Sequence, residues 1–203
     1  SSIEQPQHTL TSNMQGFGNI LEACRQHYVT HFVYASSSSV YGQAWTASRE
    51  TDCTDYPLSL YAASKKSNEA MAHSYSECFG LPCTGLRIFN TYGDWGRPDM
   101  ALSRFARCIL GGESATLHDN GNISRDFVFI DDTVEAIMRI LPRPPNNYRV
   151  INISSGTSTC IIDAFHMLED ILGRKGHILN RPLPEGNPIT TWGNNDKLFE
   201  LTE

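Results

Sequence analysis

Apolar residues recur along the chain in two alternating patterns. From Met14 to Cys24 they fall at three- and four-residue steps, which is typical of an amphipathic helix. The polar residues 11–13, Thr-Ser-Asn, are expected to cap the start of that helix. Residues 31–35 are a short apolar run followed by four serines at 36–39, which predicts a buried parallel strand that ends in a polar loop.

The same alternation continues through the rest of the chain. Residues 42–60 lack clear periodicity and are expected to run over the surface. Further helices are expected at 60–79, 99–111, 131–141 and 161–172, strands at 83–89, 126–130 and 150–153, a polar loop at 90–98, and a Pro- and Gly-rich tail at 181–193. Helices that alternate with short apolar strands predict an α/β protein with a doubly wound, Rossmann-like parallel sheet.

One part of a complete dinucleotide-binding fold is missing from these 203 residues. Such a fold opens with a strand, a Gly-x-Gly-x-x-Gly turn and a helix whose N-terminus receives the pyrophosphate. Gly16-Phe-Gly18 lies inside a predicted helix with no strand before it, and we interpret it as two small packing residues. The sequence therefore predicts a partial doubly wound sheet.

Composition and charge narrow the possible partners. The 22 acidic residues outnumber the 16 basic ones, and the formal net charge of -6 argues against nucleic acid and anionic membranes as partners. No run approaches the roughly 20 apolar residues of a membrane span, and residues 1–5 lack the features of a signal peptide, so we expect a cytoplasmic protein. The six cysteines form no Cys-x-x-Cys pair. His27 and His31 straddle a predicted helix end and strand start, so no metal site is expected.

Three residues carry candidate chemistry. Tyr61 and Lys65 lie four residues apart near the start of a predicted helix and share a face. A positive charge stabilises phenolate, so Lys65 together with an oxidised nicotinamide would lower the pKa of Tyr61 toward that of a useful base. A solvated helix pair is the alternative interpretation of this spacing. Ser37 follows the strand at 31–35, at the sheet edge where open α/β proteins keep their sites, although a turn rich in side-chain-to-backbone bonds would also use serines.

Four ordered motifs carry a resemblance: Ala-Ser-Ser-Ser-Ser-Val-Tyr-Gly at 35–42, Ser-Leu-Tyr-Ala-Ala-Ser-Lys at 59–65, Leu-Arg-Ile-Phe-Asn-Thr-Tyr-Gly at 86–93 and Arg-Asp-Phe-Val-Phe-Ile-Asp-Asp at 125–132. The chain resembles the extended short-chain dehydrogenase/reductase family of nucleotide-sugar epimerases and dehydratases. Residues 95–101, Trp-Gly-Arg-Pro-Asp-Met-Ala, are most similar to the UDP-glucuronate 4-epimerases. The resemblance covers nearly the whole chain but only the middle of such an enzyme. We therefore expect a fragment without the N-terminal glycine-rich turn that binds NAD weakly or not at all.

The resemblance implies a role for each matching residue. Tyr61 would be the catalytic base and acid, Lys65 its electrostatic partner, and Ser37 the group that orients a hydroxyl. The residues that would contact NAD are Tyr61, Lys65, Asn13 and Ser36. Those that would contact the UDP-sugar are Ser37, Ser38, Ser39, Asn90, Arg97 and Arg125.

The resemblance also implies a reaction and an organisation of the molecule. The expected reaction is NAD-dependent epimerisation at C4 through a 4-keto intermediate, converting UDP-glucuronate to UDP-galacturonate, which serves polysaccharide biosynthesis. A homodimer is expected, formed largely by the helix that bears Tyr61 and a neighbouring helix. Residues 1–93 would belong to the dinucleotide-binding domain with the catalytic residues. Residues 94–203 would be a mixed, largely nucleotide-sugar-binding region at the C-terminal side, with 125–141 returning to the main domain.

Departures from the family pattern keep alternatives open. Asn90 stands where the glucuronate epimerases usually carry threonine, and an asparagine at this position is more similar to the UDP-galactose 4-epimerases. Gly186-Asn187 stands where Gly-Asp is usual. Dehydratases and decarboxylases of the family place Asp or Glu where this chain has Ser38 and Ser39, which favours the epimerase. The alternatives are a UDP-galactose 4-epimerase, a nucleotide-sugar dehydratase or decarboxylase, and a catalytically incomplete fragment that retains part of the sugar-nucleotide site.

Overall fold

The computed structural model describes residues 2–202 and contains helices on both sides of a short parallel sheet. The α-helices are α1 (Pro6–Leu10), α2 (Gly16–Gln26), α3 (Leu60–Phe79), α4 (Ala101–Gly111), α5 (Ile130–Ile140), α6 (Ile161–Leu172) and α7 (Asp196–Thr202). The other helical turns are the π-helical η1 (Thr11–Gln15) and the 3-10 turns η2 (Ser38–Tyr41) and η3 (Asp119–Gly121). The strands are β1 (Phe32–Ala35), β2 (Cys83–Ile88), β3 (Asn90–Tyr92), β4 (Ser114–His118), β5 (Ser124–Arg125), β6 (Phe127–Phe129), β7 (Tyr148–Ile153), β8 (Thr159–Cys160), β9 (His177–Arg181) and β10 (Thr190–Thr191).

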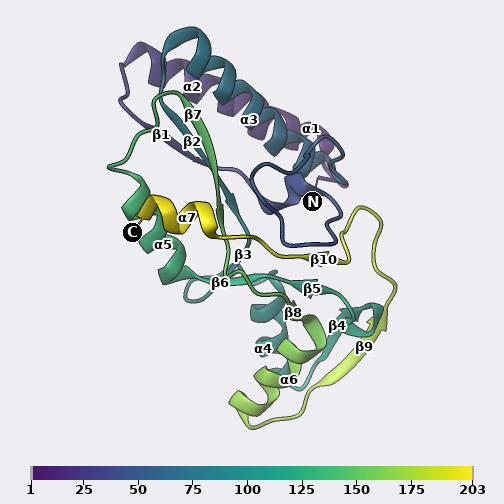
Figure 1. Cartoon of the computed structure of the whole chain (residues 1–203). Coiled ribbons are helices and arrows are strands. Elements are labelled where there is room, and N and C mark those ends of the chain that lie inside the picture. Colours follow the sequence, from purple (N-terminus) through teal and green to yellow (C-terminus); the bar gives the residue numbers. More distant parts are fainter. Residues whose placement is uncertain (1, 203) are drawn as a thin grey trace.

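The main sheet has the order β1-β2-β7, and its strands are all parallel. Because successive side chains of a strand point to opposite faces, each strand serves two cores. On one face Cys83 packs with Leu21 of α2 and Ala72 of α3. On the other, Leu86 packs with Ile140 of α5 and Leu198 of α7. Figure 1 shows α2 and α3 along one side of this sheet and α5 and α7 on the other, which confirms the predicted α/β class with a parallel sheet.

A second region lies beyond the carboxyl ends of these strands (Figure 1). Its core joins Phe105 of α4, Leu117 of β4 and Phe165 of α6, with the two phenylalanine rings edge to face at 5.5 Å. Its small sheets are β4 with β9, β3 with β6, and the trio β10-β5-β8. The pairing of β3 with β6 lies at the junction, because β3 begins two residues after β2 ends.

Several expected boundaries are wrong. The polar residues 11–13 do not cap a helix, since the helical segment begins at Pro6 and passes through η1 into α2. Residues 90–92 of the expected loop form β3. Strands β4, β5, β8, β9 and β10 and helix α7 were not predicted. All five of these strands are only two to five residues long and pair with segments distant in sequence, so periodicity alone does not mark them.

The predicted division at residue 93 stays a prediction, with one correction that the strand pairing requires. Strand β7 lies in the main sheet beside β2, and α7 packs against β7 and α5. Residues 148–153 and 196–202 therefore lie with the first region, as residues 130–140 do. Among residues 2–202, no helix combines the length and the apolar character needed to cross a membrane.

Candidate active site

The polar turn after β1 is organised around the hydroxyl of Ser37. This residue has extended backbone and caps η2, and its Oγ accepts hydrogen bonds from Ser39 N at 3.2 Å and Ser39 Oγ at 2.9 Å. Within residues 2–202, no group accepts the proton of the Ser37 hydroxyl in return. Ser37 can therefore donate to a ligand while its neighbours hold its oxygen in place.

Helix α3 presents Tyr61 and Lys65 at the same end of the sheet. Ser59 caps the helix by accepting from Ala62 N at 3.2 Å, which places Tyr61 in the first turn with 40% of its surface exposed. One turn later, Lys65 Nζ lies 5.8 Å from the centre of the Tyr61 ring and donates to Ala35 O at 2.8 Å. Lys65 thus joins α3 to the last residue of β1, two residues before Ser37. Burial lowers the pKa of Lys65.

The π-helical turn η1 brings Asn13 against the same helix. Asn13 Nδ2 donates to Ser64 Oγ at 3.0 Å, and Ser64 Oγ donates to Tyr61 O at 2.8 Å. When the side-chain amide of Asn68 is oriented with its nitrogen toward two backbone carbonyls, it donates to Asn13 O at 2.8 Å and to Ser64 O at 3.1 Å. Single π turns within helices are frequent at functional sites. The predicted contact of Asn13 with a cofactor stays a prediction, and its present partners are on α3.

Ser36 has a buried partner. Its Oγ donates to Glu69 Oε1 at 2.6 Å, and the Glu69 carboxylate is also paired with Arg87 of β2. Sequence reasoning missed Glu69 and Arg87. The signal was available: Glu69 follows Lys65 by one helical turn, and Arg87 is a charge inside an apolar strand. The predicted cofactor contact of Ser36 stays a prediction. In this structure the Ser36 hydroxyl donates its hydrogen bond to Glu69.

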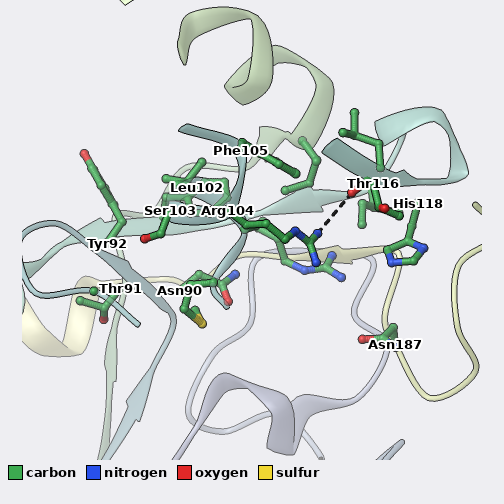
Figure 2. A pocket seen from close by; sticks show the side chains of 18 of the residues that line it. Asn90, Thr91, Tyr92, Leu102, Ser103, Arg104, Phe105, Thr116, His118 and Asn187 are labelled. Carbon is green, nitrogen blue, oxygen red and sulfur yellow. Dashed lines mark hydrogen bonds between the residues drawn. The ribbon is translucent and has the colours of Figure 1, made fainter. Parts of the chain in front are cut away.

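A cavity of about 220 Å³, open to solvent, lies in the second region beside β3 and α4. Figure 2 shows the labelled side chains around it, including Asn90, Arg104, His118 and Asn187. Two predicted substrate residues line it, Asn90 and Arg125. The wall also includes Leu102, Phe105, Phe127, Ile161 and Leu183. Mostly apolar walls with a few polar groups are typical of small-molecule sites.

The two arginines of this cavity are held by backbone carbonyls. Arg125 donates to Ser124 O at 2.8 Å, Ile189 O at 3.1 Å and Pro188 O at 2.9 Å, and burial lowers its pKa. Arg104 donates from Nη2 to Thr116 O at 3.2 Å (Figure 2), and its buried Nε has no partner in the described part of the chain. Arg104 is a lining residue that the motifs did not indicate.

The remaining predicted residues do not line this cavity. Arg97 is exposed and forms a fork with Asp99, with N···O distances of 3.0 and 2.6 Å. The hydrogen bond and charge of Asp99 raise the pKa of Arg97. Ser38 and Ser39 lie half-buried in η2. The structure thus groups the predicted residues other than Arg97 in two places, at the start of α3 beside the end of β1 and in the cavity.

A parallel sheet with a Tyr-x-x-x-Lys pair and a serine turn at its carboxyl edge defines the class of short-chain dehydrogenase-like proteins. Residues 1–154 match the model of the NAD dependent epimerase/dehydratase family, and the chain belongs to that family. It is 42% identical to protein CapI of Staphylococcus aureus over 98% of this chain and 65% of that protein.

Two further relatives carry more specific names. The chain is 35% identical to a probable UDP-glucuronate 4-epimerase of Rhizobium meliloti, over 99% of this chain and 64% of that protein. Among solved structures, it superimposes on UDP-glucuronic acid 4-epimerase from Bacillus cereus, in complex with UDP-glucuronic acid and NAD, with a TM-score of 0.90 and 33% identity. That match covers 95% of this chain and 62% of the other. The chain thus spans less than two thirds of the length of these relatives.

Proposed function

We propose that this chain carries the catalytic residues of an NAD-dependent UDP-sugar 4-epimerase, with UDP-glucuronate and UDP-galacturonate as substrate and product. The observation that carries the proposal is the position of Lys65. Its Nζ is hydrogen-bonded to Ala35 O at the end of β1 and lies 5.8 Å from the centre of the Tyr61 ring. The relatives named for UDP-glucuronate epimerisation support the choice of sugar.

Tyr61 is the acid and base of the proposed reaction. Its phenol is half exposed at the start of α3, so a sugar hydroxyl has access to it. The Lys65 ammonium stabilises the phenolate form by charge. Phenolate Tyr61 takes the proton of the C4 hydroxyl, Ser37 donates a hydrogen bond to the sugar oxygen, and Tyr61 returns the proton after the 4-keto sugar has turned over.

The residues at this end of the sheet suit the nicotinamide riboside part of NAD. Lys65 has three N–H donors, and the described contacts use one of them, on Ala35 O. The other two are available to ribose hydroxyls. Bound there, NAD would supply the acceptor for the C4 hydride and the donor that returns the hydride to the opposite face of the sugar. The glycine-rich turn that would receive the pyrophosphate does not occur in the 203 residues.

The cavity of the second region would hold the UDP part of the substrate. Arg125 and Arg104 supply positive charge beside apolar walls, which suits a diphosphate and a uracil ring. Arg97, together with Ser38, Ser39 and Asn90, would restrain the sugar carboxylate. Such restraint matters because a 4-keto uronic acid is a β-keto acid that loses carbon dioxide when its carboxylate is aligned for cleavage.

The decisive experiment is an assay with UDP-glucuronate and NAD⁺ on a polypeptide of the length that the relatives have. Replacing Tyr61 by Phe removes the proton-transferring oxygen and is expected to lower kcat by about 10²–10⁴-fold without loss of the fold. Tyr56→Phe, a change at an exposed tyrosine outside the site, is the matched control.

The products distinguish the candidate reactions. UDP-galacturonate supports the proposal, released carbon dioxide indicates a decarboxylase, and loss of water a dehydratase. Conversion of UDP-glucose but not UDP-glucuronate would indicate a UDP-galactose 4-epimerase, the reaction favoured by Asn90. Near-normal activity of Tyr61→Phe would show that Tyr61 is not the base.

We further propose a homodimer that acts in the cytoplasm in polysaccharide biosynthesis. The six cysteines are all free thiols, as expected in a reducing compartment. Light scattering coupled to gel filtration tests the dimer: a single peak at the monomer mass at micromolar concentration would exclude it.

A further inference from the structure

The turn that carries Ser37 is held at its first residue by a buried carboxylate. Ser36 Oγ donates to Glu69 Oε1 at 2.6 Å, and both residues are 3% exposed. A hydrogen bond to an ionised acceptor is shorter and stronger than one between neutral groups. Because Ser36 precedes Ser37 directly, this bond limits how far the Ser37 hydroxyl can move from α3.

Glu69 is itself fixed by a fork of two hydrogen bonds. Arg87 donates from Nε to Glu69 Oε1 and from Nη2 to Glu69 Oε2, both at 2.9 Å, and both side chains are buried. Glu69 lies on α3 one turn after Lys65 and two turns after Tyr61, and Arg87 lies on β2. The planar fork therefore sets the orientation of the carboxylate that holds Ser36 and ties the helix of Tyr61 to the sheet.

The same arginine contacts the last residue of the turn. The Arg87 guanidinium lies over the Tyr41 ring at 4.7 Å from its centre, and Tyr41 Oη donates to Asn152 Oδ1 at 2.7 Å. Arg87 Nη1 also donates to Glu50 O at 3.3 Å. Arg87 thus holds Ser36 through Glu69 at one end of the turn and packs on Tyr41 at the other.

We propose that Glu69 and Arg87 are positioning residues, which hold the Ser37 hydroxyl relative to Tyr61 in the arrangement that the reaction needs. This inference rests on the proposed function. Neither residue touches substrate in this arrangement, because both are buried under the turn. Buried ion pairs contribute little net stability on average. We therefore assign the Glu69–Arg87 pair the role of fixing the geometry of residues 36–41. A displacement of about 1 Å at a reacting group costs about 10²-fold in rate.

The test removes the Ser36 hydroxyl and leaves the ion pair in place. Ser36→Ala is made in the active enzyme, and kcat, KM for UDP-glucuronate, bound NAD and hydrogen exchange of the turn amides are measured. We expect kcat to fall by about tenfold or more, with KM and NAD content within about twofold. Exchange of Val40 N–H and Gly42 N–H, which bond to Ser37 O and Ser39 O, should become faster.

Ser76→Ala is the matched control. Ser76 lies on the same helix, is 2% exposed, and its hydroxyl has no hydrogen-bond partner among the described residues. Its loss is therefore expected to change neither kcat nor exchange in the turn. Glu69→Gln, which leaves the Arg87 charge unpaired, should lower kcat at least as much as Ser36→Ala; if it does not fold, Ser36→Ala decides alone.

Three results would overturn the proposal. The first is a kcat of Ser36→Ala within about twofold of the parent. The second is a fall in kcat without faster exchange in the turn. The third is loss of bound NAD, which would assign Ser36 to the cofactor instead. An inactive parent enzyme would reject the proposed function itself, so that the two failures are distinguishable.

Discussion

At the scale of single residues, the structure shows how neighbours select protonation states. His31 bonds through Nδ1 to Leu141 O at 2.9 Å and through Nε2 to Thr84 Oγ1 at 2.8 Å. Arg149 Nε donates to the same Thr84 oxygen at 3.0 Å. The Thr84 hydroxyl proton is therefore free to point at Nε2, and the ring is held as the neutral Nδ1–H form. Burial, with a further contribution from the Arg149 charge, lowers the pKa of His31.

His31 should make the folded state less stable in mild acid. Its folded-state pKa lies below the unfolded value of 6.5, so the unfolded chain binds the proton more tightly. The stability that the neutral ring provides is thus present above pH 6.5 and is lost as pH falls below that value. His31→Gln should flatten the change in Tm between pH 7.5 and 5.5, and His177→Gln, at an exposed position, should not. An equal pH dependence in His31→Gln and the parent would contradict this assignment.

At the scale of elements, α3 is the part of the fold on which the site depends most. Its first turn presents Tyr61 and Lys65, and its middle holds Ser64, Asn68 and Glu69 against η1 and the sheet. It ends at Gly80, whose φ of 66° is a left-handed conformation that glycine adopts without steric cost. The helix is therefore defined at both ends by its own sequence.

The cap at the start of α3 should contribute measurably to stability. Ser59→Ala removes the acceptor of Ala62 N–H, which is expected to lower the free energy of unfolding by about 1 kcal/mol. Ser59→Asp keeps an acceptor and places a negative charge at the helix N-terminus, so it should retain most of that stability. Urea unfolding of the three proteins measures the difference. Equal midpoints for Ser59→Ala and the parent would show that the cap contributes nothing.

At the scale of the whole molecule, the 203 residues supply different parts of the two halves of the candidate site. The cavity with Asn90 and Arg125 is lined by described residues, most of them in the second region. The sheet next to Tyr61 has three strands, and the 203 residues include no glycine-rich turn for a pyrophosphate. The affinity for the two ligands should therefore differ.

The 203-residue chain is expected to bind UDP and to retain little NAD. A ligand at 100 times its Kd stabilises the folded state by about 2.7 kcal/mol, so UDP should raise Tm. Arg125→Ala should abolish that rise, because it removes a guanidinium from the cavity. NAD released on denaturing the purified chain should be far below one equivalent. A stoichiometric amount of NAD would contradict the expected weak binding, and an unchanged Tm with UDP would place the nucleotide elsewhere.

The sequence by itself determined the elements that depend only on residues close together in the chain. The strand at 31–35, the helix from Leu60 to its glycine stop and the pairing of Tyr61 with Lys65 on one face all follow from patterns within a few turns of chain. Only the tertiary structure decided the rest. The short strands exist through partners 30 or more residues away. The fork between Glu69 and Arg87 joins a helix to a strand, and its burial became visible only when the two were packed together. Periodicity reports which face of one element is apolar, whereas pairing and burial depend on which elements meet.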